Sequence, residues 1–392
     1  MKGQQEGAAD LYAVRRRKRR MRLLRRSVLF VAIAAMLLLL YQKRDLWLPR
    51  LETIGSKHQS LHGEGSNAEG EFPLPVYGGE GCQIGKINQK LAVLSDSYLN
   101  IYETDGALHA ARQHTYGAPM LQTAGNYALV YESGGTRFRL DTSGGMKYEK
   151  TASDSIIFGR VSENGQVLLV TGSDSCACRM LVFNVKGQAF YERNCVEDVT
   201  EAEFSPDESG CYAVSIRTEN GSLKSVVHSY SFKSGDLWSS QPLDMLVISV
   251  YNTGSGGLFL LGDEAASYLD SHGAVRSTYT YPDALAGGDC IGDTAAVLLR
   301  NDDKRTYTVA ILNGDASSPV CQVYDRTVKS IGLMPDSKNV LVQMRTRLEK
   351  LHLNGTAGDS VAVSDGFSGF LQIGSYIFLS GYDRIDRVDF RN

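Results

Sequence analysis

The feature of this sequence that most limits its fold is an apolar run that recurs about every 40 residues. Eight copies start 36, 39, 45, 46, 38, 44 and 37 residues apart: LAVLS at 91, YALVY at 127, QVLLV at 166, CYAVS at 211, GLFLL at 257, AAVLL at 295, NVLVQ at 339 and YIFLS at 376. A second apolar segment ending in a glycine turn follows most copies, as in LVFNVKGQAF and LHLNGTAG. Short strands and turns repeated at this period are typical of propeller blades.

Other repeat architectures fit the pattern less well. No 12-residue window of the body keeps a helical apolar stripe free of glycine, which argues against a helical repeat. A β-sandwich has short strands but no regular self-similarity. The expected fold class is therefore all-β, a β-propeller with eight blades, or with seven if the first and last units share one blade.

The two ends of the repeat region complement each other. The last unit ends with YDRIDRVDF and lacks an outermost strand, whereas FPLPVYGG at 72–79 precedes the first unit. If the early segment completes the last unit, the ring closes and no sheet edge is left exposed.

Charge is unevenly distributed along the chain. Residues 1–26 hold ten Lys/Arg and two carboxylates, which leaves 31 basic and 42 acidic residues in the remainder. An acidic body argues against nucleic acid as a partner. The basic tail is expected to lie on anionic lipid.

An uncharged run, SVLFVAIAAMLLLLY at 27–41, follows the basic tail. It is shorter than the roughly 20 residues that usually span a bilayer. Long basic side chains and a tryptophan flank the run and can anchor it at the membrane interfaces: Arg25, Arg26, Lys43, Arg44 and Trp47. A cleaved signal peptide would need small residues where QKRDLWLPR stands, so one transmembrane helix is predicted over 27–48.

The positive charges also predict the topology. Ten precede the apolar run and four follow it closely, so the N-terminus is expected in the cytoplasm and the body outside. Residues 49–72 are polar and rich in Gly and Ser, as in a flexible linker. The predicted order is a basic cytoplasmic tail (1–26), an anchor (27–48), a linker (49–72) and an extracytoplasmic propeller (73–392), in a single-pass protein of the cell membrane.

The turns of three units carry a family resemblance. FSPDESGCYAVS, MPDSKNVLVQM and VSENGQVLLVTG each place a turn before an apolar strand. The Pro-Asp copies resemble the SPDG-K repeat of TolB-like and WD40-like propellers, although no Trp-Asp pair closes any unit. The whole layout is similar to an uncharacterised family of membrane-anchored propeller proteins of Gram-positive bacteria. That family has no assigned function, so the resemblance implies architecture and location only.

All seven cysteines lie in the body, and an odd, low number does not indicate a disulfide framework. If Lys186-Gly187 is a two-residue hairpin turn, Cys178 faces Cys195, where a disulfide would fit. A three-residue loop with a glycine bulge shifts the register and removes the match. Cys176 and Cys178 also suggest a metal site, but no second pair or nearby histidine supports it.

No signature of a known propeller enzyme is present. The sequence lacks G-x-S-x-G elbows, Asp boxes and repeated tryptophans, and the five body histidines show no ligand spacing: His109, His114, His228, His272 and His352. Five aspartates near strand ends fit either a channel ring that binds a cation or basic peptide, or turn caps, which is the favoured interpretation: Asp105, Asp141, Asp236, Asp270 and Asp383. No catalytic residue, cofactor or metal is assigned.

The expected function is therefore non-catalytic binding of a protein or cell-envelope partner by a membrane-anchored disc. The alternative is an extracytoplasmic hydrolase or lyase, or a ligand sensor, with its site at the channel mouth. That alternative requires His, Asp and Arg from different blades to meet at one end of the channel.

Overall fold

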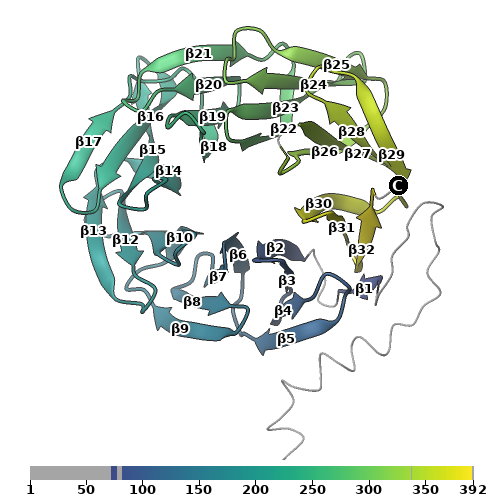
Figure 1. Cartoon of the computed structure of the whole chain (residues 1–392). Coiled ribbons are helices and arrows are strands. Elements are labelled where there is room, and N and C mark those ends of the chain that lie inside the picture. Colours follow the sequence, from purple (N-terminus) through teal and green to yellow (C-terminus); the bar gives the residue numbers. More distant parts are fainter. Residues whose placement is uncertain (1–71, 77–81, 337, 391–392) are drawn as a thin grey trace, which may run out of the picture. The chain divides into compact units, whose positions relative to one another are not determined.

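A computed structural model describes residues 72–76, 82–336 and 338–390, which form a ring of eight four-stranded antiparallel sheets (Figure 1). The predicted all-β propeller with eight blades is confirmed. The predicted tail, anchor and linker, with Arg25, Arg26, Lys43, Arg44 and Trp47, lie outside these residues, apart from Phe72 at the end of the linker. Within the described ranges, no helix has the length and apolar character that crossing a bilayer requires.

The strands follow chain order from the centre of the ring outward in blades 1 to 7. Blades 1 to 4 contain β2 (Gln83–Ile87), β3 (Lys90–Leu94), β4 (Tyr98–Tyr102), β5 (Leu108–Gln113); β6 (Pro119–Ala124), β7 (Tyr127–Glu132), β8 (Arg137–Thr142), β9 (Gly145–Thr151); β10 (Ile156–Val161), β11 (Val167–Thr171), β12 (Cys178–Phe183), β13 (Ala189–Cys195); β14 (Asp198–Phe204), β15 (Gly210–Glu219), β16 (Ser222–Ser231), β17 (Gly235–Ser239). Blades 5 to 7 contain β18 (Val247–Asn252), β19 (Leu258–Gly262), β20 (Ala265–Leu269), β21 (Val275–Thr280); β22 (Ala284–Ile291), β23 (Thr294–Asn301), β24 (Thr306–Asn313), β25 (Val320–Tyr324); β26 (Val328–Leu333), β27 (Asn339–Met344), β28 (Arg347–His352), β29 (Ala357–Ala362).

Blade 8 is built from both ends of the repeat region. Its strands are β30 (Phe367–Ile373), β31 (Tyr376–Gly381), β32 (Arg384–Asp389) and β1 (Leu74–Pro75), in that order outward. Leu74 pairs with Ile385 and Pro75 with Arg384. The early segment therefore supplies the missing outermost strand, as predicted, and the seven-blade alternative is wrong.

Each recurring apolar run is the second strand of a blade. In β11, for example, all five residues are buried. The side chains of this strand pack on both neighbouring blades, so the sequence of the strand is continuously apolar. The cluster that includes Leu168, Phe204 and Cys211 joins blade 3 to blade 4 in this way. Packing between adjacent blades thus forms the core.

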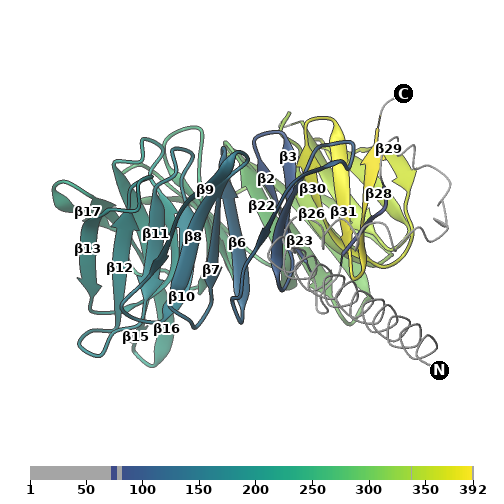
Figure 2. The ribbon, with the colours of Figure 1, turned by 90° about the horizontal axis from the view of Figure 1, so that it is seen from below.

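The loops lie alternately on two faces of the ring (Figure 2). We call one the entry face: it carries the connections between blades and the turns between second and third strands. Backbone hydrogen bonds join these two kinds of loop, as from Ser133 N to Ala118 O and from Tyr281 N to Glu264 O, both 2.9 Å. The opposite exit face carries the remaining turns.

Candidate functional site

A cavity of about 250 Å³ lies at the entry face, between blades 3 and 4. Its lining comes from the end of β13, the connection 196–197 and strands of blade 4: Arg193, Asn194, Cys195, Val196, Glu197, Val199, Ser215, His228, Tyr230, Asp236 and Ser239. The connection has only two residues between strands, which brings the outer edge of blade 3 against blade 4. Polar and apolar side chains both line the cavity, and most of them come from the connection 196–197 and from strands outside the innermost one.

Ser215 and His228 form the centre of the polar wall. The buried Ser215 hydroxyl donates to the Glu197 carboxylate, and its oxygen lies 2.9 Å from Nε2 of His228. Nδ1 of His228 lies 2.8 Å from Oγ of Ser239. In a serine-hydrolase triad the carboxylate orients the imidazole through Nδ1. Here the carboxylate contacts the serine instead, so the geometry is that of a hydrogen-bonded wall.

The charges of this wall are largely paired. Burial lowers the pKa of His228 despite the opposing effect of Glu197, so the imidazole is neutral at pH 7. Arg193 lies 4.0 Å from the centre of the Tyr230 ring and pairs with Asp236 at 2.8 Å. One guanidinium and two carboxylates thus give the wall an acidic balance.

The two cysteines of the predicted pair face each other. Cys178 lies opposite Cys195 in the register of β12 and β13, and both are free thiols in the structure. The predicted two-residue turn is wrong, because residues 184–188 connect the strands and Phe183 lies opposite Ala189. An irregularity between Val182 and Phe183 then shifts the register by one residue and restores the cysteine pairing.

Inner strands of blades 3 to 8 each carry a register irregularity near the entry face, whereas β2 and β6 do not. The unpaired residues are Ile157, Thr200, Ile248, Ala286, Lys329 and Ser368. A β-bulge redirects side chains away from the regular ladder. Ile157 and Ile248 are about half exposed as a result, at 48% and 50%.

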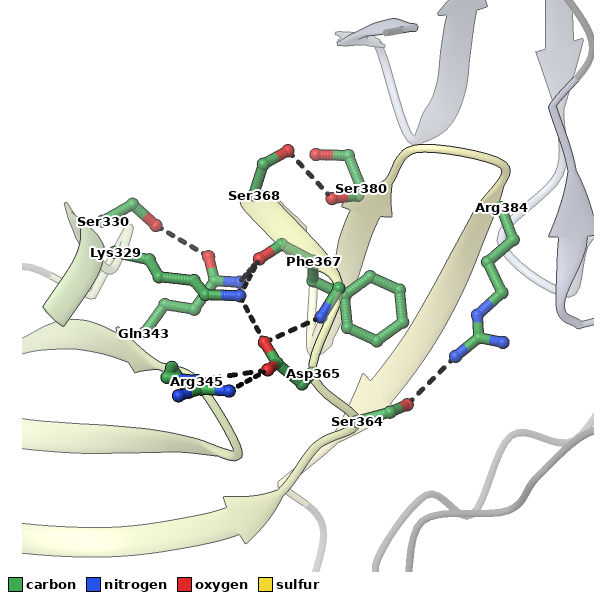
Figure 3. Close-up of polar contacts among 11 residues, drawn as sticks. Lys329, Ser330, Gln343, Arg345, Ser364, Asp365, Phe367, Ser368, Ser380 and Arg384 are labelled. Atoms are coloured by element: carbon green, nitrogen blue, oxygen red, sulfur yellow. Dashed lines mark hydrogen bonds and ion pairs between the residues drawn. The ribbon is translucent and has the colours of Figure 1, made fainter. Parts of the chain in front are cut away.

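Lys329, the basic member of this set, is bound within a polar cluster between blades 7 and 8 (Figure 3). Its ammonium group donates to Asp365 at 2.8 Å and to the Phe367 carbonyl at 3.0 Å. Arg345 reaches the same carboxylate at 2.7 Å. Hydrogen bonds from Lys329 and Arg345 hold the pKa of Asp365 well below its usual range. The cluster therefore fixes the connection 363–366 to blade 7.

Four exposed large apolar side chains lie at the entry face on blades 3 to 5. These four side chains, which we call the apolar sector, are Ile157, Val196, Leu223 and Ile248. Val196 is 93% exposed and also lines the cavity. Of the other exposed large apolar side chains in the described residues, Tyr382 lies elsewhere on the entry face and five lie on outermost strands. The described exit-face loops therefore hold no exposed large apolar side chain. Sequence reasoning missed this sector, although a valine within NCVED is a visible signal.

The predicted carboxylate candidates do not form a channel ring. Asp105 and Asp270 accept hydrogen bonds from turn N–H groups, as the favoured interpretation required. Asp236 pairs with Arg193 on an outer strand, and Asp383 lies in the turn 382–383. Asp141 is fully buried in β8 between two arginines. Among the described residues, no three His, Cys, Asp or Glu are placed to hold a metal ion.

The fold and the comparisons define a β-propeller of the broad class that includes WD40 domains. BamB from Moraxella catarrhalis matches with 10% identity over 79% of this chain and 96% of that chain, at a TM-score of 0.56. Chaetomium thermophilum Sqt1, solved bound to the N-terminus of the ribosomal protein L10, matches with 12% identity over 81% of this chain and 98% of that chain, at a TM-score of 0.59. The WD40 domain of SCAP from fission yeast matches with 10% identity over 85% of this chain and 97% of that chain, at a TM-score of 0.55.

The chain belongs to DUF5711, a family of unknown function, whose model matches residues 78–365. No curated protein matches the sequence significantly.

Proposed function

We propose that this chain is a single-pass membrane protein of a Gram-positive bacterium whose propeller lies outside the cell and binds a protein of the envelope without catalysis. The observation that carries the binding function is the apolar sector on the entry face, because exposed apolar patches mark interaction surfaces. The Ser215, His228 and Glu197 arrangement supports the non-catalytic part, since it lacks the geometry of an acyl-transfer triad. Sqt1 is a similar fold that was solved with a bound protein segment.

The charge of the loops defines the chemistry of the partner. The described entry-face loops carry thirteen carboxylates and four Lys/Arg: Asp96, Asp154, Asp174, Glu197, Asp244, Asp263, Glu264, Asp283, Asp302, Asp303, Asp325, Asp365 and Asp383 against Lys304, Arg305, Arg326 and Arg345. The described exit-face loops carry nine carboxylates and three Lys/Arg: Glu103, Asp105, Glu163, Asp207, Glu208, Asp270, Asp293, Asp315 and Asp336 against Lys186, Lys233 and Lys338. Both faces are acidic, so the partner is a segment with basic and apolar side chains, and the apolar sector selects the entry face.

The direction of β1 supports this choice of face. Val76 N donates to the Asp383 carbonyl in an entry-face turn, so the chain runs through β1 toward the entry face. Phe72 packs on Phe378, before the strand begins. The first described residues therefore lie at the exit-face end of β1 in blade 8, away from the apolar sector on blades 3 to 5.

Substitution of Val196 by Asp is expected to reduce capture of the partner at least tenfold. A charge placed in an apolar contact costs well over the ~1.4 kcal/mol that corresponds to a tenfold change in affinity. The measurement is chemical cross-linking on intact cells, followed by isolation of the tagged chain and quantitative mass spectrometry. Val323→Asp is the matched control, because Val323 is 57% exposed on the outer strand β25.

Two outcomes separate the possibilities. Envelope proteins that are retained by Val323→Asp and lost by Val196→Asp and Ile248→Asp support docking at the apolar sector. Equal capture by all variants contradicts it.

Digestion of protoplasts with an external protease tests the proposed topology. The propeller is expected to be degraded, leaving a small membrane-bound fragment that contains residues 1–48, because the positive charges keep the tail inside. Lysed protoplasts, in which the tail is also accessible, are the control. Protection of the whole chain in intact protoplasts would show that the topology is wrong.

A further inference from the structure

We propose that Cys178 and Cys195 form a disulfide bond that closes the hairpin of β12 and β13. The two residues lie directly opposite each other in an antiparallel pair. Opposed residues have Cα atoms about 4.5–5.5 Å apart, within the roughly 4.4–6.8 Å that a disulfide requires. Both side chains belong to one buried cluster, so the two residues lie on the same side of the hairpin.

The two thiols are also in contact. The interaction between the two neighbouring thiols lowers the pKa of Cys178 to about 7 while raising that of Cys195. Each thiol also has a carbonyl acceptor, that of Glu197 at 3.7 Å for Cys178 and that of Arg193 at 3.9 Å for Cys195. A thiolate is the nucleophile in disulfide exchange. The pair therefore contains a sulfur that ionises readily beside its partner thiol.

The other five cysteines offer weaker alternatives. Cys176 is near the pair, but it precedes β12 and no strand register places it opposite another cysteine. Cys211 lies opposite Phe204 and Tyr230 on β15, and burial raises its pKa to about 12. The remaining three belong to other blades: Cys82, Cys290 and Cys321. Among all seven cysteines, the strand registers place Cys178 and Cys195 alone opposite each other.

The oxidation is an exchange with a disulfide-bearing oxidant of the extracytoplasmic space. Cys195, which lines the cavity, exchanges first: its deprotonated sulfur attacks one oxidant sulfur, forms a mixed disulfide and releases the other oxidant sulfur as a thiolate. The neighbouring Cys178 thiolate then attacks the Cys195 sulfur, forms the internal bond and releases the second oxidant thiolate. The two electrons pass to the oxidant, which leaves as two thiols. This step rests on the proposed extracytoplasmic location.

The bond would act on the apolar sector. Cys195 lines the cavity and directly precedes Val196, the most exposed member of the sector. A covalent link from Cys195 to Cys178 fixes the start of the connection 196–197. The disulfide would thus hold the docking residue in place.

Peptide mapping can identify the bond. The tagged full-length chain, purified in detergent, is treated with oxidised glutathione, alkylated and digested. Trypsin alone is insufficient, because peptide 161–179 contains Cys176 and Cys178, and peptide 194–217 contains Cys195 and Cys211. A second digestion after Glu separates Cys195 from Cys211, since Glu197, Glu201 and Glu203 lie between them.

Four single variants assign the sulfurs. The linked peptides are expected in the natural chain, Cys176→Ser and Cys211→Ser, and absent from Cys178→Ser and Cys195→Ser. A bond to any other cysteine, or no bond after oxidation, overturns the proposal.

Trapping in cells tests the compartment separately. The chain is precipitated from cells with acid and alkylated at once, and the oxidised form is expected to predominate. If the cysteine pair is reduced in cells although the purified chain forms the bond, the proposed extracytoplasmic location is wrong. The geometry of the pair then permits a disulfide that does not form in the cell. That result would overturn the natural occurrence of the bond.

Discussion

A chain that begins at residue 77 is expected to unfold at much lower denaturant concentration than one that begins at residue 72. The five residues removed include β1, the outermost strand of blade 8. Leu74 is buried in a cluster with Phe378 and Ile385, and Phe72 packs on the same cluster. Their loss exposes this apolar surface and leaves the edge of β32 unpaired. The free energy of unfolding should fall by more than about 3 kcal/mol, since truncation of one buried leucine costs roughly 2–5 kcal/mol.

Guanidinium unfolding, followed by tyrosine fluorescence and circular dichroism, measures the difference. Leu74→Ala in the longer chain tests the same contact without deletion, and should lose about 2–5 kcal/mol. Val323→Ala on an exposed outer strand is the control and should change stability by less than about 0.5 kcal/mol. Equal midpoints for the two chain lengths would mean that β1 does not close the ring energetically.

The closing strand was predictable because it depends on the same pattern as the rest of the fold. Second strands are buried on both faces, so β11 and β19 appear in the sequence as uninterrupted apolar runs. Eight such runs predict eight blades, and the incomplete last unit indicates where the extra strand belongs. Outermost strands such as β13 and β21 are mostly exposed and carry no comparable signal.

The candidate site was less predictable because its parts meet only through pairing and packing. Ser215 and His228 lie on adjacent strands and Glu197 lies in the preceding connection, with no spacing that marks a site. The inner-strand bulges that expose Ile157 and Ile248 could not be predicted from the sequence either. One unpaired residue only shifts the alternation of buried and exposed side chains by one position. The cysteine register was obtained from an incorrect turn, and a bulge near Phe183 compensated for the error.

Asp141 shows the same limit in a structural role. Its position near a strand end resembles that of the turn-capping aspartates, yet the carboxylate is fully buried. Nε of Arg139 lies 2.8 Å from one carboxylate oxygen, and Arg112 donates to the other at 3.0 Å. The two guanidinium groups also donate to the carbonyls of Gln113 and Thr142. The cluster thus joins the outer strand of blade 1 to blade 2.

Substitution of Asp141 by Ala is therefore expected to lower the free energy of unfolding by about 3–5 kcal/mol, because it leaves the buried Arg139 and the adjacent Arg112 without their anion. Asp141→Asn keeps the size and removes only the charge, so it should also be destabilised. The matched control is Asp105→Ala, which removes an exposed turn cap and should cost no more than about 1 kcal/mol. Chemical unfolding of the three variants gives the comparison. If Asp141→Ala is destabilised while Asp141→Asn is as stable as the natural chain, the charge is unimportant and the loss comes from packing and hydrogen bonding. Equal losses in both substitutions identify the buried anion as the group that joins the two blades.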